Sequence, residues 1–197
     1  MRATPTADVA VYARRRMPRA LRELPTVDLD GVTTARRVIV VGSHADLSAV
    51  LTRLLREDRL DVEVAHVRRW GSARRALRGT ATLVPLIRDD TGAVITQAGY
   101  WLPPSEDATT IVGEATVDDT LLFDGEVTAV RVEPIDEMPG LRAAVLSPRM
   151  RPRRWITGRA VQLGTTGAMV VRDGAPGPRP VRRSTFYRHF HGWRRVG

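Results

Sequence analysis

The chain has 197 residues, 43% of them hydrophobic, and a formal net charge of +9 at pH 7. These values are typical of a globular protein with one full core or two small ones, and they exclude a disordered chain. No cysteine is present, which excludes disulfides, zinc–thiolate centres, iron–sulfur clusters and cysteine nucleophiles. All 31 basic residues counted as Lys+Arg are arginine, so a Walker-type P-loop, a Schiff-base enzyme and a lysine general base are also excluded.

The positive charge predicts attraction to polyanions, which include nucleic acid, anionic lipid and nucleotide phosphates. The arginines are spread along the whole chain, a pattern that a solvated basic surface also gives. No apolar run approaches the roughly 18 to 20 residues that span a bilayer, and Arg14, Arg15 and Arg16 stand where a secretory signal carries its apolar stretch. We therefore expect a cytoplasmic protein, with peripheral membrane contact as the alternative that its charge allows.

Residues 1–31 read as a basic N-terminal appendage. Tyr12, Met17, Leu21 and Leu24 recur at roughly helical spacing, which fits an amphipathic segment that packs on the body or lies on an anionic membrane. Packing on the body is the interpretation we favour. Pro18 interrupts any single continuous helix unless the helix begins near it.

A buried strand, a tight turn and a helix follow in sequence. The β-branched run Val38–Val41 ends at Gly42 and is typical of an inner parallel strand. Ser43 and Asp46 have the spacing of a capping box, and apolar residues then recur at helical spacing from Leu47. A second strand between residues 61 and 67 is expected to return beside the first through a βαβ crossover.

After Gly79 the pattern changes to short β-rich segments separated by Asp-Gly, Thr-Gly, Pro-Pro and Pro-Gly turn signals. This pattern predicts antiparallel sheet. The fold class is therefore α/β plus β: a small nucleotide-binding-like α/β unit at residues 32–79, followed by an antiparallel β-sandwich at residues 80–197.

The turn at Gly42 has the arrangement of an anion site. Unpaired backbone amides at a helix N-terminus and the positive end of the helix dipole point to the same place, where a phosphate binds well. A lone glycine after a strand is also found in simple structural turns, so this pattern leaves both interpretations open.

The order of elements resembles that of the diacylglycerol kinase, sphingosine kinase and NAD kinase superfamily over much of residues 36–188. Those kinases join a nucleotide-binding α/β domain to a β-sandwich, and a Gly-Gly-Asp-Gly-Thr loop lies between a strand and a helix. The segment from Val38 to Leu51 is similar to that element, although only Gly42 clearly matches the loop. The chain thus resembles a divergent, actinobacterial-type member with a degenerate glycine-rich loop. The resemblance implies a phosphate-binding turn formed by Gly42, Ser43, His44 and Asp46.

A second family segment, Pro-x-Gly-Thr-x-Asn-Asp followed by an Ala-Arg-x-Leu helix, is similar to Val64–Gly79. Gly71 and Ser72 stand for the Gly-Thr pair, and the helix begins at Ala73, but the Asn-Asp pair is absent. The resemblance implies ATP and magnesium as cofactors. Because the Asn-Asp pair helps to hold both in the family, its loss weakens that expectation.

Two Asp-Gly segments compete for the acidic residue that the lipid kinases use as a base. Asp124-Gly125-Glu126 matches the family triplet, whereas Asp173-Gly174 has the expected late position in the chain. The resemblance implies that Asp124 or Asp173 accepts a proton from the substrate hydroxyl. A hairpin turn is the structural interpretation of each segment.

The sequence predicts no metal site, because His189 and His191 lack an HExxH pattern or a nearby acidic cluster. The leading hypothesis is a lipid- or nucleotide-kinase-like protein that binds nucleotide phosphates and, if active, phosphorylates a lipid or small-molecule hydroxyl. The alternative is a non-enzymatic arginine-rich protein that binds nucleic acid, an anionic membrane or a protein partner. Trp155, with arginines at positions 151, 153 and 154, is a candidate for stacking on a base.

Overall fold

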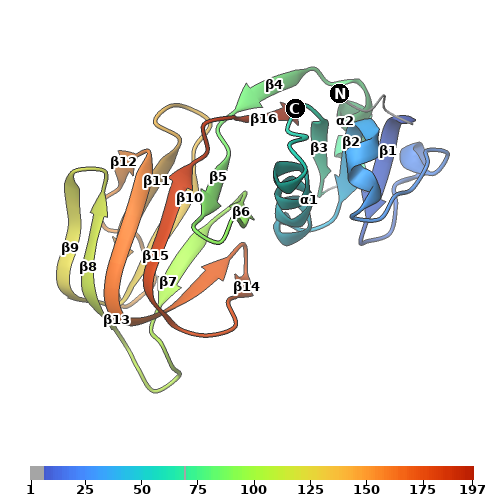
Figure 1. The fold of residues 1–197 in the computed structure, drawn as a ribbon. Coiled ribbons are helices and arrows are strands. Elements are labelled where there is room, and N and C mark those ends of the chain that lie inside the picture. The colour runs from blue at the N-terminus through green and yellow to red at the C-terminus, as the bar shows by residue number, and fades with distance from the viewer. Residues whose placement is uncertain (1–6, 69) are drawn as a thin grey trace. The chain divides into compact units, whose positions relative to one another are not determined.

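The computed structural model describes residues 7–68 and 70–197, which form two compact units. Unit 1 contains Met1–Val84 and His191–Gly197, and unit 2 contains Pro85–Phe190. The ribbon in Figure 1 shows unit 1 as helices on a small sheet and unit 2 as strands. No helix among the described residues is long and apolar enough to cross a membrane.

The sheet of unit 1 is built around the β-branched strand β2, which pairs in parallel with β1 on one side and β3 on the other. The expected inner parallel strand and its βαβ crossover are thereby confirmed. The sheet order is β1-β2-β3-β16-β4, and only β4 is antiparallel to its neighbour. The strands are β1 (Ala7–Ala13), β2 (Ala35–Val41), β3 (Glu63–Val67), β4 (Ala81–Val84) and β16 (Trp193–Val196).

Helices cover both faces of this sheet. Side chains along a strand alternate between its two faces, so each inner strand has apolar residues to pack on both sides. Ile39, Val41 and Ala65 pack in one cluster with the helix α2. The helix α1 contacts β2 and buries Leu47, Val50, Leu51 and Leu54. The helical elements are η1 (Arg19–Leu21), η2 (Gly31–Thr34), α1 (His44–Arg56), η3 (Trp70–Ser72) and α2 (Ala73–Arg78).

The N-terminal segment corrects one expectation from the sequence. Ala7–Ala13 is a strand paired with β2, not part of an amphipathic helix, and Tyr12 is buried in it. The parallel ladder offers this apolar, β-branched stretch more burial than a solitary helix would, and Pro18 lies just beyond it. Leu21 is fully buried, which confirms that the segment packs on the body.

Unit 2 is an antiparallel β-sandwich, as its turn pattern predicts. The long strand β13 pairs with β15 and β8 through its first half and with β7 and β14 through its second half. One strand therefore belongs to both sheets, and the core between them contains Trp101 and Phe186. The strands are β5 (Ile87–Asp89), β6 (Val94–Ile95), β7 (Gly99–Leu102), β8 (Ile111–Val117), β9 (Thr120–Val127), β10 (Ala129–Pro134), β11 (Leu141–Leu146), β12 (Ile156–Gly158), β13 (Ala160–Arg172), β14 (Ala175–Pro176) and β15 (Val181–Arg188).

The two units have different bounds from the three segments inferred from the sequence. β4 and β16 both belong to the sheet of unit 1, because β16 returns from the end of the chain and lies between β3 and β4. A pairing across more than a hundred residues leaves no local signal in the sequence.

A buried arginine fastens α2 to the sheet. Arg37 on β2 is 7% exposed, and its Nη1 donates to the carbonyl oxygens of Ala76 at 3.2 Å and Leu77 at 2.7 Å. Its Nε donates to Glu63 at 2.7 Å and its Nη2 to the Gly79 carbonyl at 3.0 Å. The Arg37 guanidinium thus donates hydrogen bonds to carbonyl groups at the end of α2, where a helix leaves its last carbonyls without N–H partners of its own.

Replacing Arg37 with Met should lower the free energy of unfolding by about 2 to 3 kcal/mol. The buried carbonyl groups at the end of α2 would lose their hydrogen-bond donor, and the Glu63 carboxylate would lose one of its two arginine partners. Arg36→Met is the matched control. Arg36 also pairs with Glu63, but it is exposed, so its loss should cost less than about 1 kcal/mol. Urea denaturation of the two variants measures both values, and equal losses would contradict the role given to Arg37.

Candidate functional site

Three parallel strands of unit 1 end at one edge of the sheet. β1 leads into Arg14–Arg16, β2 into the turn at Gly42, and β3 into Arg68 and the residues before α2. The backbone N–H of Arg14 donates to the Val41 carbonyl at 3.0 Å, which ties the first two segments together. In open α/β sheets ligands bind outside the carboxyl ends of the strands, so this edge is the candidate site.

The turn after β2 is closed by a capping box. The Ser43 side chain accepts from the Asp46 backbone N–H at 3.2 Å. In return, Asp46 Oδ2 accepts from the backbone N–H of Ser43 and from its hydroxyl, each at 2.7 Å. The predicted capping box and helix start are confirmed.

The position of Asp46 changes what the turn offers to a ligand. A Cβ on Gly42 would lie 2.4 Å from Asp46 Oδ2, so glycine is required here by the carboxylate itself. The Ser43 amide, which would face a phosphate in an open turn, is already bonded to an anion of the chain. The Asp46 carboxylate therefore stabilises the positive end of the α1 helix dipole from within the chain.

Two histidines lie beside the turn. His66 on β3 bonds the Gly42 carbonyl through Nε2 at 3.1 Å, and its ring contacts that of His44 edge to face at 5.0 Å between centroids. Arg68 donates to His44 Nε2 at 3.0 Å, so that nitrogen carries no proton in this arrangement. His66 and Arg68 were not singled out from the sequence, and only the β3 pairing register brings them to Gly42.

Burial lowers the pKa of His66 below its usual value, and the positive charge of Arg68 lowers it further. The hydrogen bond to the Gly42 carbonyl acts in the opposite direction, because it favours the protonated ring. The net effect keeps His66 neutral where a free histidine would begin to charge.

Lowering the pH should therefore destabilise the protein through His66. The unfolded chain binds the proton more readily than the folded one, so stability is complete above the ordinary pKa of 6.5 and falls as the pH drops towards the lowered folded pKa. His66→Gln should flatten the dependence between about pH 5 and 6.5, where one group contributes at most about 1.4 kcal/mol per pH unit. Urea titrations across this range measure the slope. An unchanged slope in His66→Gln would contradict the role given to His66.

Gly71 and Ser72 follow β3 and so come after the carboxyl end of that strand. Ser72 stands at the N-cap position of α2 but makes no side-chain cap hydrogen bond, and a Cβ on Gly71 would meet no atom within 4 Å. Trp70 precedes Gly71, and the Trp70 side chain lies outside the described part of the chain.

A hollow of about 680 Å³ lies at the end of β1 on this edge. It is lined by residues 12–14 of the strand end and by residues 26–30 of the following loop. Arg14 supplies a positive charge, whereas Asp28 accepts from the Gly31 N–H at 2.8 Å and Asp30 pairs with Arg53 at 3.4 Å. The volume lies in the range of ligand pockets, and no sequence pattern predicts it.

The two candidate acids lie in unit 2 and differ in their surroundings. Asp173 is held at a φ of 48° in the β13–β14 hairpin, and its carboxylate accepts from the backbone N–H groups of Thr96, Gln97 and Ala98 at 2.7 to 2.8 Å. Asp124 lies within β9, opposite Glu114 in the register. The hairpin interpretation is confirmed at Asp173 and wrong at Asp124, which is in a strand.

No protein-only magnesium site is evident at these positions. The described residues contain no group of three or more His, Asp or Glu side chains that could hold a metal ion. Magnesium prefers several oxygen ligands, which no such group among the described residues supplies.

Comparison with known proteins gives matches at the level of structure alone. No family model and no curated protein matches the sequence. A diacylglycerol kinase from Bacillus anthracis str. Sterne superposes with a TM-score of 0.70 at 9% identity, over 96% of each chain. This chain has the fold of the diacylglycerol and NAD kinases.

Two nucleotide-bound structures share this kinase fold. An NAD kinase from Archaeoglobus fulgidus in complex with ATP matches with a TM-score of 0.65 at 12% identity, over 96% of this chain and 93% of that one. Yeast NADH kinase complexed with NADH matches with a TM-score of 0.66 at 8% identity, over 98% of this chain and 84% of that one. The kinase-like fold inferred from the order of elements is thereby confirmed.

Proposed function

We propose that the protein is a divergent kinase-fold protein that binds nucleotide phosphates at the carboxyl edge of the unit 1 sheet and has little phosphotransfer activity. The fold supports nucleotide binding, since neighbours with this fold are described with ATP and with NADH. The observation that carries the loss of activity is the Asp46 carboxylate on the Ser43 amide. A phosphate at the same amide would meet a negative charge in place of a free donor.

The remaining positive groups determine where phosphate binds in this proposal. Arg14–Arg16 and Arg68 follow β1 and β3 at the same edge, and the hollow beside Arg14 leaves room for the rest of a nucleotide. Gly71 and Ser72 follow β3 at the same edge, and a Cβ on Gly71 would meet none of the described atoms within 4 Å. We assign nucleotide phosphates to these groups, with magnesium carried by the phosphates themselves.

Any residual reaction would be ATP-dependent phosphorylation of a hydroxyl on a lipid or small molecule. Of the two acids, Asp124 is the one that we assign to the acceptor hydroxyl, because it is exposed and no hydrogen bond to its carboxylate occurs within the described residues. The Asp173 carboxylate already accepts from three backbone N–H groups, which hold a turn.

Asp46→Ala should strengthen ATP binding by about tenfold, or about 1.4 kcal/mol, because it removes the competing carboxylate and frees the Ser43 amide. The same change should lower stability by about 1 kcal/mol through loss of the cap. Calorimetry with ATP and magnesium measures the first effect, and urea denaturation the second.

The matched control is Asp61→Ala. It removes the same charge, but Asp61 precedes β3 and so lies at the opposite edge of the sheet. ATP affinity should stay within about twofold of the wild-type value in this variant. Absence of ATP binding at about 1 to 10 mM in both wild type and Asp46→Ala would end the nucleotide-site proposal.

A second candidate function, binding of a polyanion, is supported by one basic segment of unit 2. Arg149, Arg151, Arg153 and Arg154 are exposed, and within the described ranges none of them forms an ion pair. The next residue, Trp155, has the Arg142 guanidinium 4.3 Å from its ring centroid. Arginines beside an aromatic ring are typical of surfaces that bind single-stranded nucleic acid.

The triple variant Arg149→Gln, Arg151→Gln, Arg153→Gln tests this candidate. If the segment contacts phosphates, the slope of log affinity against log salt for a single-stranded oligonucleotide should become shallower by about 2, since each contact contributes about 0.7. The control removes the three exposed arginines of α2 at positions 74, 75 and 78. Equal changes in the two variants would show that net charge alone attracts the oligonucleotide.

A further inference from the structure

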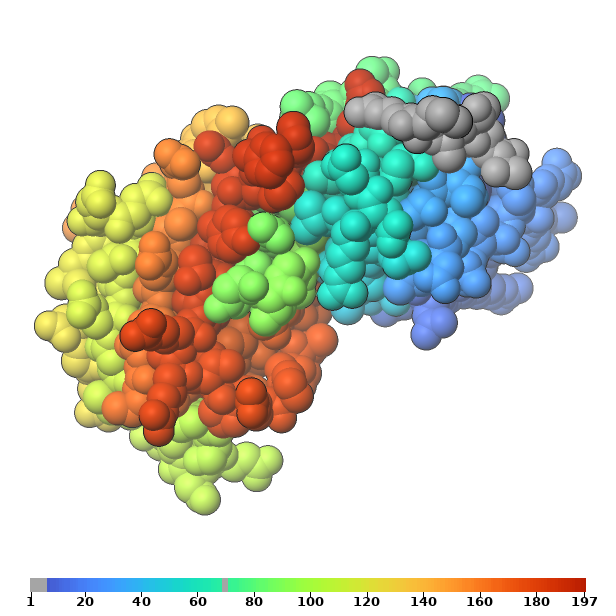
Figure 2. All heavy atoms as spheres, in the orientation of Figure 1, coloured from blue at the N-terminus to red at the C-terminus, as the bar shows by residue number. Residues whose placement is uncertain are grey.

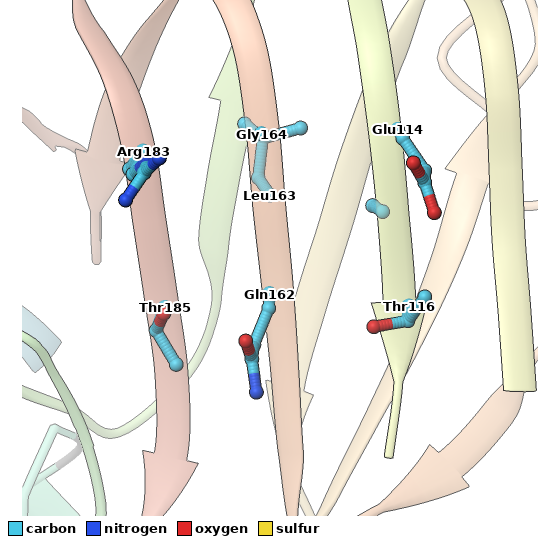
Figure 3. Close-up of a pocket in the computed structure, with 8 residues that line it drawn as sticks. Glu114, Thr116, Gln162, Leu163, Gly164, Arg183 and Thr185 are labelled. Carbon is cyan, nitrogen blue, oxygen red and sulfur yellow. The ribbon is translucent and has the colours of Figure 1, made fainter. Parts of the chain in front are cut away.

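A hollow opens on the outer face of unit 2, where β8, β13 and β15 run side by side. Its volume is about 310 Å³, and its lining includes Glu114, Thr116, Gln162, Gly164, Arg183 and Thr185. Figure 3 shows Arg183 and Glu114 on the two flanking strands, with Gly164 on the strand between them. The orange and red atoms of the β13–β15 segment lie at the surface in Figure 2.

The hollow exists because Gly164 has no side chain. Gly164 is the register partner of Arg183 on β15 and of Glu114 on β8, so all three lie in one row across the sheet. A Cβ at Gly164 would meet no atom within 4 Å, so no packing or turn geometry requires glycine there. With strands spaced about 4.8 Å apart, the Cα atoms of Arg183 and Glu114 are about 10 Å apart.

The next row supplies neutral hydrogen-bonding groups. Gln162 is the register partner of Thr185 and of Thr116, and these three side chains adjoin the charged row. The alternate residues of the same strands, such as Leu163 and Phe186, pack in the core and hold β13 and β15 in position. The hollow is therefore polar and stands on rigid strands.

The charges that flank the hollow do not satisfy each other. Across the described part of the chain, neither Arg183 nor Glu114 takes part in an ion pair, and the side chains of Thr116, Gln162 and Thr185 form no hydrogen bond. Elsewhere in this unit, arginine and acid on adjacent strands do pair, as Arg142 and Glu133 do at 2.6 Å. The gap at Gly164 keeps the two opposite charges apart.

We propose that this hollow binds a small amino carboxylate, a molecule that carries one carboxylate and one ammonium group. The Arg183 guanidinium binds the carboxylate in a bidentate manner, and the Glu114 carboxylate binds the ammonium. Thr116, Gln162 and Thr185 bond the remaining polar atoms. A space of this size holds a ligand of about ten heavy atoms, since one water takes about 30 Å³. The proposal does not rest on the nucleotide site, because every residue in it belongs to unit 2.

Titration of the full chain with glycine, β-alanine and 4-aminobutanoate, followed by NMR, tests the proposal and measures the spacing that fits best. At least one of them should bind with a dissociation constant of about 1 mM or lower, whereas acetate and methylammonium alone should bind at least about tenfold more weakly. Arg183→Gln and Glu114→Gln should each reduce affinity by about tenfold or more. Arg182→Gln is the matched control and should leave the affinity unchanged.

Gly164→Val fills the hollow and leaves the charges of Arg183 and Glu114 in place. Valine suits a strand and its Cβ has open space, so the variant should fold with wild-type stability and lose binding. Absence of binding by all three amino carboxylates at about 50 mM would overturn the proposal, and so would unchanged binding by Gly164→Val. If the probes do not bind and Arg183→Gln instead abolishes self-association in sedimentation, the face belongs to a second copy of the chain and the proposal is wrong.

Discussion

The contact between the Asp46 carboxylate and Ser43 determines both the local fold of unit 1 and what its Gly42 turn can offer to an anion. It ends β2, starts α1 and requires glycine at position 42, because the carboxylate occupies the space of a Cβ. The same contact neutralises the positive end of the helix, which would otherwise attract a phosphate. The carboxylate that stabilises the turn therefore occupies the backbone amide that an anionic ligand would need.

Unit 2 depends on a different constraint, the continuity of β13. This strand takes part in both sheets of the sandwich, with an irregular register between Gly164 and Ala168 where its partners change. One side of its first half faces the core, and the other side faces solvent. Substitutions on the solvent side are tolerated more easily, which is why an unpaired row such as Arg183–Gly164–Glu114 can exist without cost to the core.

Much of the local structure was predictable from particular residues. Val38–Val41 predicted an inner parallel strand, the Ser43 and Asp46 spacing predicted the cap, and the turn signals after Gly79 predicted antiparallel sheet. The N-terminal strand was missed because Tyr12, Met17, Leu21 and Leu24 happen to recur at helical spacing, while burial against β2 decides the outcome. The catalytic roles of Asp124 and Asp173 stay predictions, and so does phosphate binding at Gly71 and Ser72.

The sequence by itself determined the strand–turn–helix order from Val38 to Leu54, the absence of cysteine and lysine chemistry, and the capping box, because each depends on residue identity or on neighbours a few positions away. Only the tertiary structure decided that His66 bonds the Gly42 carbonyl, that Arg37 holds the end of α2, and that β16 completes the first sheet. The physical reason is that these contacts join residues far apart in the chain. Their pairing register is set by the burial of whole strands and helices, which no local pattern records.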